Sequence, residues 1–313
     1  METNKEKSSS LRWRILRNAF ISTSLRPTDD SCESDKRRKI SRKTSSQGFN
    51  LIKSTLTLIN PVDVDDISKP DLDVYVSYTL PLEKDPQLVL RQRVDNKFNL
   101  NDFEICNRYD IDNTGLVCHW PSEDVLAYFC LSHKDMFRYK RVLELGAGYG
   151  LAGLVIAACT DALEVIISDG NPQVVDYIQH NIHANSGAFA DTKVNSMLLH
   201  WNQDQDSRFF KSFDIIVASD CTFFKEFHVG LAQTIKSFLK HSDASEALFF
   251  SPKRGNSLDM FLKKIQEIGL NFAITENYDQ EVWQRHEKFL NGDESWPNYE
   301  KDHCYPFLVR ITS

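Results

Sequence analysis

The sequence of 313 residues lacks any long hydrophobic run: no stretch of about 18 consecutive apolar residues occurs in it. A membrane-spanning helix needs about 20 such residues, and a signal peptide needs an apolar core close to the N-terminus. The first ten residues are polar and carry charges of both signs. We therefore expect a cytoplasmic protein without stable membrane association.

Cysteine is scarce and has no metal-binding or disulfide pattern. The seven cysteines are an odd number and never form a Cys-x-x-Cys pair; they are Cys32, Cys106, Cys118, Cys130, Cys159, Cys221 and Cys304. Disulfide frameworks and structural zinc sites both need closely patterned cysteines. His180 and His183 are spaced i, i+3, but no nearby Cys or third His completes a set of ligands. We expect reduced thiols and no bound metal.

Several catalytic motifs are also missing. The sequence contains no His-Glu-x-x-His, Gly-x-Ser-x-Gly or Walker A pattern. Metalloprotease, serine hydrolase and NTPase functions therefore have no support.

The charge is divided unevenly along the chain. Residues 1–48 hold 12 of the 37 Lys and Arg residues and 6 of the 44 Asp and Glu residues, which leaves the rest of the chain with 25 basic and 38 acidic residues. An acidic body repels polyanions, so we expect no nucleic-acid partner.

The basic segment, residues 1–48, is Ser-rich and of low complexity, which is typical of a disordered tail. Residues 11–20 within it have the spacing of a basic amphipathic helix, suited to a membrane surface, an acidic partner such as calmodulin, or the body of the protein. The run Lys36–Lys39 matches a nuclear import signal, so a nuclear fraction is a second possibility. The alternative is a simple solvated tail.

Globular composition begins at about residue 49. β-rich runs at 49–59, 74–80 and 88–94 predict an N-terminal β element over residues 49–118. A helix is predicted after Pro121. From 119 to 313 predicted strands (141–145, 164–169, 194–201, 213–219, 246–251, 272–276 and 307–311) are interspersed with predicted helices (151–159, 172–185, 227–240 and 257–268). This pattern predicts an α/β fold with a mostly parallel, doubly wound sheet that binds ligands at the carboxyl ends of its strands.

A glycine-rich turn follows the strand at 141–145. The segment runs Glu144-Leu-Gly146-Ala147-Gly148-Tyr-Gly150, so the glycines are spaced G-x-G-x-G and not in the G-x-G-x-x-G pattern of a dinucleotide site. Glycines at such a turn let the backbone approach a ligand closely. Glu144 favours a cationic ligand group over a pyrophosphate.

The pattern E-x-G-x-G-x-G resembles motif I of the seven-strand, Rossmann-like S-adenosylmethionine methyltransferases. The resemblance implies that Glu144, Gly146, Ala147 and Gly148 lie at the cofactor. It also makes Asp169, at the end of the next strand, the carboxylate that accepts both ribose hydroxyls.

Asp220 and Phe223 follow the buried strand at 213–219 and resemble the (D/E)-x-x-(Y/F) signature of the family 16 protein methyltransferases. Enzymes that methylate amines of nucleic-acid bases usually carry Asn/Asp-Pro-Pro-Tyr/Phe there, so a protein side chain is the expected acceptor. The resemblance implies that Asp220 orients the acceptor amine and that Phe223 contacts its methylammonium form through cation–π attraction. Phe223 has no hydroxyl, which excludes a role for a phenol.

Two tryptophans extend the resemblance. In relatives the tryptophan at the position of Trp120 lies against the cofactor, and the one at the position of Trp201 neighbours its adenine. Ser219, at the end of the strand before Asp220, is expected in the same cofactor site. The alternative for both tryptophans is ordinary core packing.

Within family 16 the chain is most similar to the calmodulin-lysine N-methyltransferases, on the segments Asp112–Gly115, Trp120–Glu123, Asp169–Asn171, Ser251–Asn256 and Glu276–Asp279. This resemblance covers residues 49–313. It implies a monomeric enzyme that trimethylates a lysine of calmodulin. The alternatives are another protein lysine, a small-molecule acceptor, or a non-catalytic adaptor that binds cofactor and calmodulin.

Overall fold

The computed structural model describes residues 48–57, 73–82, 86–93, 111–117 and 120–313, together with Asp102 and Ile105. The tail predicted over residues 1–48, with its helix and its basic run, lies outside the described residues except for Gly48.

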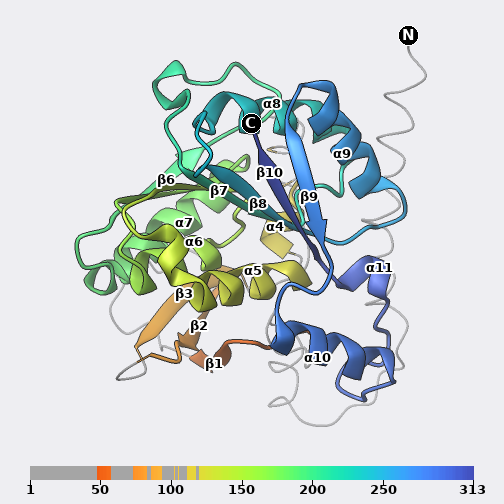
Figure 1. The fold of residues 1–313 in the computed structure, drawn as a ribbon. Helices are drawn as coiled ribbons and strands as arrows, with labels where there is room; N and C mark the ends of the chain where they lie inside the picture. The colour runs from red at the N-terminus through yellow and green to blue at the C-terminus, as the bar shows by residue number, and fades with distance from the viewer. Residues whose placement is uncertain are drawn as a thin grey trace. The chain divides into compact units, whose positions relative to one another are not determined.

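A seven-strand sheet forms the centre of the described structure (Figure 1). Its strands are β4 (Arg141–Leu145), β5 (Glu164–Asp169), β6 (Lys193–Leu198), β7 (Ile215–Ser219), β8 (Glu246–Ser251), β9 (Asn271–Thr275) and β10 (Phe307–Thr312). They lie in the order β6-β5-β4-β7-β8-β10-β9. The first five strands in this order are parallel to one another, and β10 is antiparallel to both of its neighbours. The predicted seven-strand, mostly parallel sheet is confirmed.

Helices cover both faces of this sheet (Figure 1). One face carries α5 (Pro121–Ser132), α6 (Leu151–Cys159) and α7 (Pro172–Ala184), and the other carries α8 (His228–Phe238) and α9 (Ser257–Glu267). The central strands are therefore buried on both sides, which explains why they are continuous apolar runs and not alternating ones. Val142, Leu143, Ile216 and Val217, for example, are fully buried.

Most element bounds agree with the sequence prediction, but one strand end and three helices differ. β6 ends at Leu198, three residues before the predicted end at Trp201. The helices α4 (Thr114–Val117), α10 (Gln280–Leu290) and α11 (Lys301–Cys304) were not predicted. α10 begins at an N-cap, Asp279, whose carboxylate accepts the Val282 N–H at 3.0 Å, and it buries Val282, His286 and Phe289. Because His286 is polar, the helical spacing of the buried residues of α10 is not evident as an apolar pattern in the sequence.

The N-terminal β element is a three-strand antiparallel sheet of β1 (Lys53–Thr57), β2 (Asp73–Thr79) and β3 (Gln87–Arg93). Asn181 of α7 and Asn185, the C-cap of that helix, accept the backbone N–H groups of Arg91 and Val89 at 2.7 and 2.9 Å, so these side chains satisfy the edge of β3. This sheet and the seven-strand sheet belong to one unit of the chain, residues 41–313.

The described residues contain neither a membrane-spanning helix nor a metal-binding cluster. Within those ranges no helix has the length and apolarity needed to cross a membrane. The same residues hold no cluster of three or more His, Cys, Asp or Glu side chains that could bind a metal ion. Cys130, Cys159, Cys221 and Cys304 are free thiols.

The packing of α6 against the sheet predicts the effect of Gly153→Ala. An alanine normally stabilises a helix interior by about 1 kcal/mol relative to glycine. At position 153, however, the added Cβ would lie 2.6 Å from Glu144 Oε2 and 2.6 Å from Ile167 Cγ1. Overpacking of this kind costs about 1–3 kcal/mol, so we expect the free energy of unfolding to fall by about 1–2 kcal/mol in urea denaturation.

The matched control is Gly187→Ala, whose Cβ would meet nothing within 4 Å. That variant should stay within about 0.5 kcal/mol of the wild type. If both variants are equally stable, α6 does not approach β4 and β5 as closely as the structure places it.

Candidate functional site

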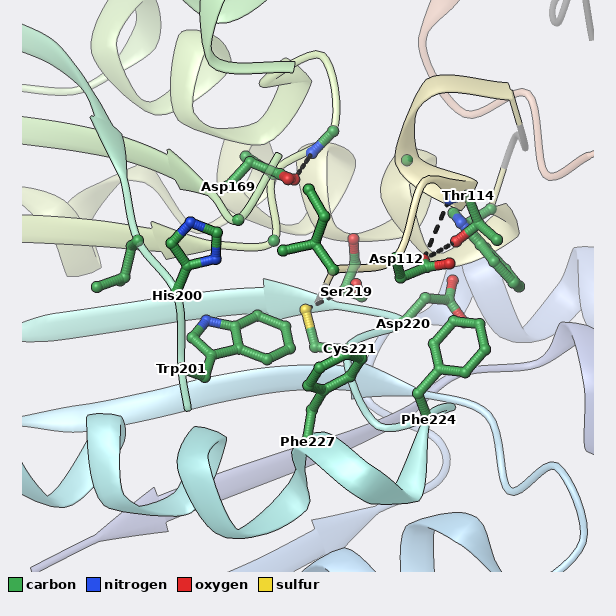
Figure 2. A pocket seen from close by; sticks show the side chains of 18 of the residues that line it. Asp112, Thr114, Asp169, His200, Trp201, Ser219, Asp220, Cys221, Phe224 and Phe227 are labelled. Atoms are coloured by element: carbon green, nitrogen blue, oxygen red, sulfur yellow. Dashed lines mark hydrogen bonds between the residues drawn. The ribbon is translucent and has the colours of Figure 1, made fainter. Parts of the chain in front are cut away.

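A cavity of about 350 Å³ opens at the carboxyl ends of β4, β5 and β7 (Figure 2). Its lining comes from segments far apart in the sequence: Ile111, Asp112, Thr114, Gly115, Trp120, Glu123, Gly146–Gly148, Asp169, Gly170, Leu199–Gln203, Ser219–Cys221, Phe224 and Phe227. Eight of the ten residues that the sequence predicted for the site are among them.

The glycine turn forms the floor of the cavity. Gly146 has φ +59°, and a Cβ there would lie 2.7 Å from Cys221 Sγ and 3.3 Å from Trp201 Cζ2. Only glycine therefore fits between β4 and these two side chains without displacing them. Ala147 donates its N–H to the Ser168 carbonyl at 2.9 Å, which fixes the turn to the neighbouring strand. Gly146, Ala147 and Gly148 all line the cavity, as predicted.

Asp169, the last residue of β5, directs its carboxylate at this turn (Figure 2). Its Oδ2 accepts the Gly148 N–H at 3.1 Å, and its Oδ1 accepts the Asn171 N–H at 2.9 Å. Burial raises the pKa of Asp169 to about 6, and these hydrogen bonds only partly oppose that effect. The carboxylate can therefore gain or lose its proton close to neutral pH.

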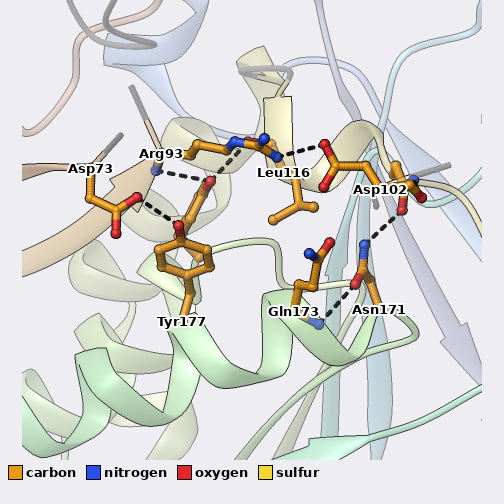
Figure 3. Close-up of polar contacts among 9 residues, drawn as sticks. Asp73, Arg93, Asp102, Leu116, Asn171, Gln173 and Tyr177 are labelled. Carbon is orange, nitrogen blue, oxygen red and sulfur yellow. Dashed lines mark hydrogen bonds and ion pairs between the residues drawn. The ribbon is translucent and has the colours of Figure 1, made fainter. Parts of the chain in front are cut away.

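A polar network around Asn171, two residues after Asp169, connects the start of α7 to the N-terminal β element (Figure 3). Asn171 caps α7 by accepting the Gln173 N–H at 2.9 Å, and its amide donates to Asn113 Oδ1 at 2.8 Å. Asn113 in turn donates to the Asp102 carbonyl at 2.6 Å, and the Asp102 carboxylate pairs with Arg93 at 2.8 Å. The N-terminal β element is thus connected by hydrogen bonds to the segment that follows Asp169.

The two predicted tryptophans and Ser219 also line the cavity. Trp201 lies in the turn after β6, where Phe227 meets it edge to face with ring centroids 6.2 Å apart. Trp120 immediately precedes α5.

Asp220 follows β7 with a left-handed backbone, φ +56°, and its carboxylate is almost fully buried. Its Oδ2 accepts the Ser122 N–H at 3.2 Å, and its Oδ1 lies 2.5 Å from Arg254 Nη2. A non-glycine residue in the left-handed region is uncommon and is often found at functional sites.

The structure places Phe223 and Glu144 outside the lining. Phe223 packs beside the cavity, with its ring centroid 5.8 Å from that of Trp120, and the neighbouring Phe224 enters the lining in its place. Glu144 lies behind the glycine turn and accepts the Gly153 N–H at 2.8 Å. Burial raises the pKa of Glu144 to about 8, so it is mostly neutral at pH 7. Direct ligand contacts by these two residues stay predictions.

Several residues that line the cavity were not predicted as site residues from the sequence. Asp112 and Thr114 stand in an Asp-x-Thr turn, where Asp112 Oδ2 accepts the Thr114 N–H at 3.2 Å at the start of α4. In the sequence, these two residues stood out only as part of the segment Asp112–Gly115, on which the family resemblance partly rests. Glu123 likewise stood only in a segment of that resemblance. His200 and Phe227 were not singled out in the sequence, and only the fold brings them to the cavity.

Comparison with known proteins was informative. Residues 107–268 match a protein family described as lysine methyltransferase. The chain is 59% identical over 313 residues to a calmodulin-lysine N-methyltransferase of Arabidopsis thaliana, covering 100% of this chain and 99% of that protein. It is 30% identical over 201 residues to the protein N-terminal and lysine N-methyltransferase EFM7 of Gibberella zeae, covering 58% of this chain and 71% of that protein. It is 31% identical over 117 residues to the protein N-lysine methyltransferase METTL21A of Danio rerio, covering 37% of this chain and 52% of that protein.

The raised pKa of Asp169 predicts pH-dependent binding of S-adenosylhomocysteine, the product form of the expected cofactor. Ribose hydroxyls donate more strongly to a carboxylate than to a neutral acid. Because burial sets the pKa of Asp169 at about 6, the carboxylate is present above pH 6 and is lost as the pH falls through that value. We expect calorimetry to give a constant Kd between pH 7 and 8 and a Kd that rises by up to about tenfold per pH unit below 6.

Asp169→Asn is the control for this experiment. It should weaken binding at pH 7.5 by about 1–3 kcal/mol and remove the pH dependence. A variant that keeps the same decline below pH 6 would assign the titration to another group. Circular dichroism at each pH confirms that the protein is folded.

Proposed function

We propose, because the chain belongs to the lysine methyltransferase family, that it transfers methyl groups from S-adenosylmethionine to a lysine of calmodulin. The observation that carries the proposal is the placement of two carboxylates in one cavity. Asp169 ends β5, Asp220 follows β7, and β4 lies between these strands. Strands are about 4.8 Å apart, so the two side chains start roughly 10 Å from each other.

The residues of the cavity fit S-adenosylmethionine. Asp169 provides acceptors for two ribose hydroxyls, and the turn at Gly146–Gly148 leaves room for the methionine portion because it carries almost no side chains. Trp201 and Phe227 offer apolar surface for a purine. When bound, the cofactor supplies a methyl group made electrophilic by a positively charged sulfur.

Asp220 is suited to hold the acceptor amine. A lysine side chain has a pKa near 10.4, so supplying its neutral form at pH 7 costs about 5 kcal/mol. Partial burial and a nearby positive charge both favour loss of that proton. Asp220 can then accept an N–H hydrogen bond from the neutral amine and aim its lone pair at the methyl carbon. The remaining rate enhancement comes from this alignment.

Calmodulin is the proposed substrate because the Arabidopsis relative, named for that activity, matches this chain over its whole length. Relatives with other names match only parts of the chain. We also propose, from the sequence alone, that the protein is a monomer of the cytoplasm, with a nuclear fraction if Lys36–Lys39 acts as an import signal. Microscopy of a fluorescent fusion, with and without that run, tests the location.

Asp220→Asn tests both the activity and the assigned residue. The purified protein is incubated with calmodulin and methyl-labelled S-adenosylmethionine, and mass spectrometry of calmodulin peptides identifies the lysine and the number of methyl groups. We expect the wild type to label calmodulin. Asp220→Asn should bind S-adenosylhomocysteine within about threefold of the wild type yet lose at least about a hundredfold in transfer rate, since the amide cannot accept with a carboxylate's charge.

Asp259→Asn on the exposed face of α9 is the matched control and should retain full activity. Transfer by Asp220→Asn within a few-fold of the wild type would show that the acceptor is held elsewhere. Label in a small molecule of a cell extract, with none in calmodulin, would replace the proposed substrate. Cofactor binding without any transfer would indicate an adaptor.

A further inference from the structure

An arginine from a distant loop neutralises the carboxylate at the acceptor end of the cavity. Arg254 lies between β8 and α9, and its Nη2 is 2.5 Å from Asp220 Oδ1. The two side chains are only 6% and 3% exposed, so water screens their interaction weakly. Separating a pair buried to this extent would leave an uncompensated charge inside the protein.

Arg254 is held on its other sides as well. The guanidinium carbon lies 4.5 Å from the ring centroid of Trp120 and 5.2 Å from that of Phe223. Its Nη2 donates to the His303 carbonyl at 3.3 Å, and its backbone N–H donates to the Asp302 carbonyl at 2.7 Å. A guanidinium does not lose its proton in proteins. Arg254 is therefore a fixed positive charge and not a side chain poised to swing away.

The rest of the cavity is acidic. Asp112 and Glu123 line it together with Asp169 and Asp220, whereas the lining that the structure describes contains no Lys or Arg. Burial raises the pKa of the Cys221 thiol and lowers that of His200, so neither adds a charge near pH 7. Cys304 of α11, which faces the ion pair, is likewise a neutral thiol because burial raises its pKa.

An acidic site of this kind opposes the chemistry that it has to support. A negative charge within about 4–6 Å of an amine stabilises the ammonium form, which has no lone pair and cannot attack. The acceptor ammonium must first give its proton to water. Its nitrogen lone pair then forms the bond to the methyl carbon, and the electrons of the breaking carbon–sulfur bond stay on sulfur.

We propose that Arg254 is a positioning residue that cancels the charge of Asp220, so that the carboxylate orients the acceptor lysine without holding it in its protonated form. This inference rests on the proposed transfer to a lysine. It adds a residue from the Ser251–Asn256 loop, which contributes nothing to the lining of the cavity.

The test is the pH dependence of methyl transfer to calmodulin in single turnovers with saturating S-adenosylmethionine. Arg254→Gln removes the positive charge and keeps a polar side chain of similar length. We expect the midpoint of its rate profile to move up by about one pH unit, so that its rate is about tenfold lower than that of the wild type at pH 7 and recovers at high pH. Arg254→Lys keeps the charge and should retain the wild-type midpoint.

Thermal unfolding and the Kd for S-adenosylhomocysteine serve as controls. The Kd should be close to the wild-type value, because Arg254 does not line the cavity. The midpoint of thermal unfolding should fall, because Asp220 loses its buried partner, and it must stay above the assay temperature for the rates to be compared. If Arg254→Gln fails to fold, Arg254→Met takes its place, since its apolar stem can pack between Trp120 and Phe223.

Three results would overturn the inference. An equal loss of rate at every pH would make Arg254 a structural contact only. A higher rate at every pH would show that the guanidinium obstructs the acceptor. A shifted midpoint in Arg254→Lys as large as in the neutral variants would show that charge is not the cause. A wild-type protein that leaves calmodulin unlabelled, in contrast, overturns the proposed substrate.

Discussion

The site depends on the shared register of three parallel strands. Glu144 of β4 pairs with Ile167 of β5 and with Val217 of β7. Gly146, Asp169 and Ser219 each lie two residues beyond these partners, so the glycine turn and two strand ends reach the same level at one edge of the sheet. Close packing on both faces fixes this register, because a one-residue slip would turn every side chain towards the opposite helix layer, where it does not fit its neighbours. The core therefore determines where the functional groups meet.

The sequence was most informative where one physical effect dominates a segment. β4, β5, β8 and α6 have the predicted bounds, because apolar runs flanked by glycine or polar residues leave few other ways to bury the chain. The glycine turn and Asp169 could be predicted for the same reason: a turn after a buried strand and an acid after the next one must share an edge. Eight of the ten predicted site residues line the cavity, and most of them, including Asp220 and the two tryptophans, were predicted through the family resemblance.

Contacts between side chains far apart in the sequence could not be predicted from apolar runs and turns. Nothing in the spacing of residues 220 and 254 indicates that the two side chains pair, since the contact depends on how the loop after β8 approaches the end of β7. The sequence likewise did not determine whether Glu144 contacts a ligand or packs against α6. Its place in the motif suggested a ligand contact, whereas the small size of Gly153 lets α6 come close enough to donate an N–H to it. Trp201 lies in a turn because β6 ends early, where the Leu199 N–H donates to the Asp169 carbonyl at 2.9 Å.

The two carboxylates of the cavity, Asp169 and Asp220, are held by different kinds of partner. Asp169 is bound by the backbone N–H groups of Gly148 and Asn171, which orient it while leaving its negative charge for hydroxyl donors. Asp220 is bound by the Ser122 N–H and by a guanidinium that carries a full positive charge. Backbone amides supply direction, and an arginine supplies a compensating positive charge. Under the proposed function, a cofactor hydroxyl needs only an oriented acceptor, whereas an amine that has to lose a proton before it reacts also needs a carboxylate whose charge is compensated. On that proposal, this difference in chemistry accounts for an arginine beside Asp220 and backbone amides beside Asp169.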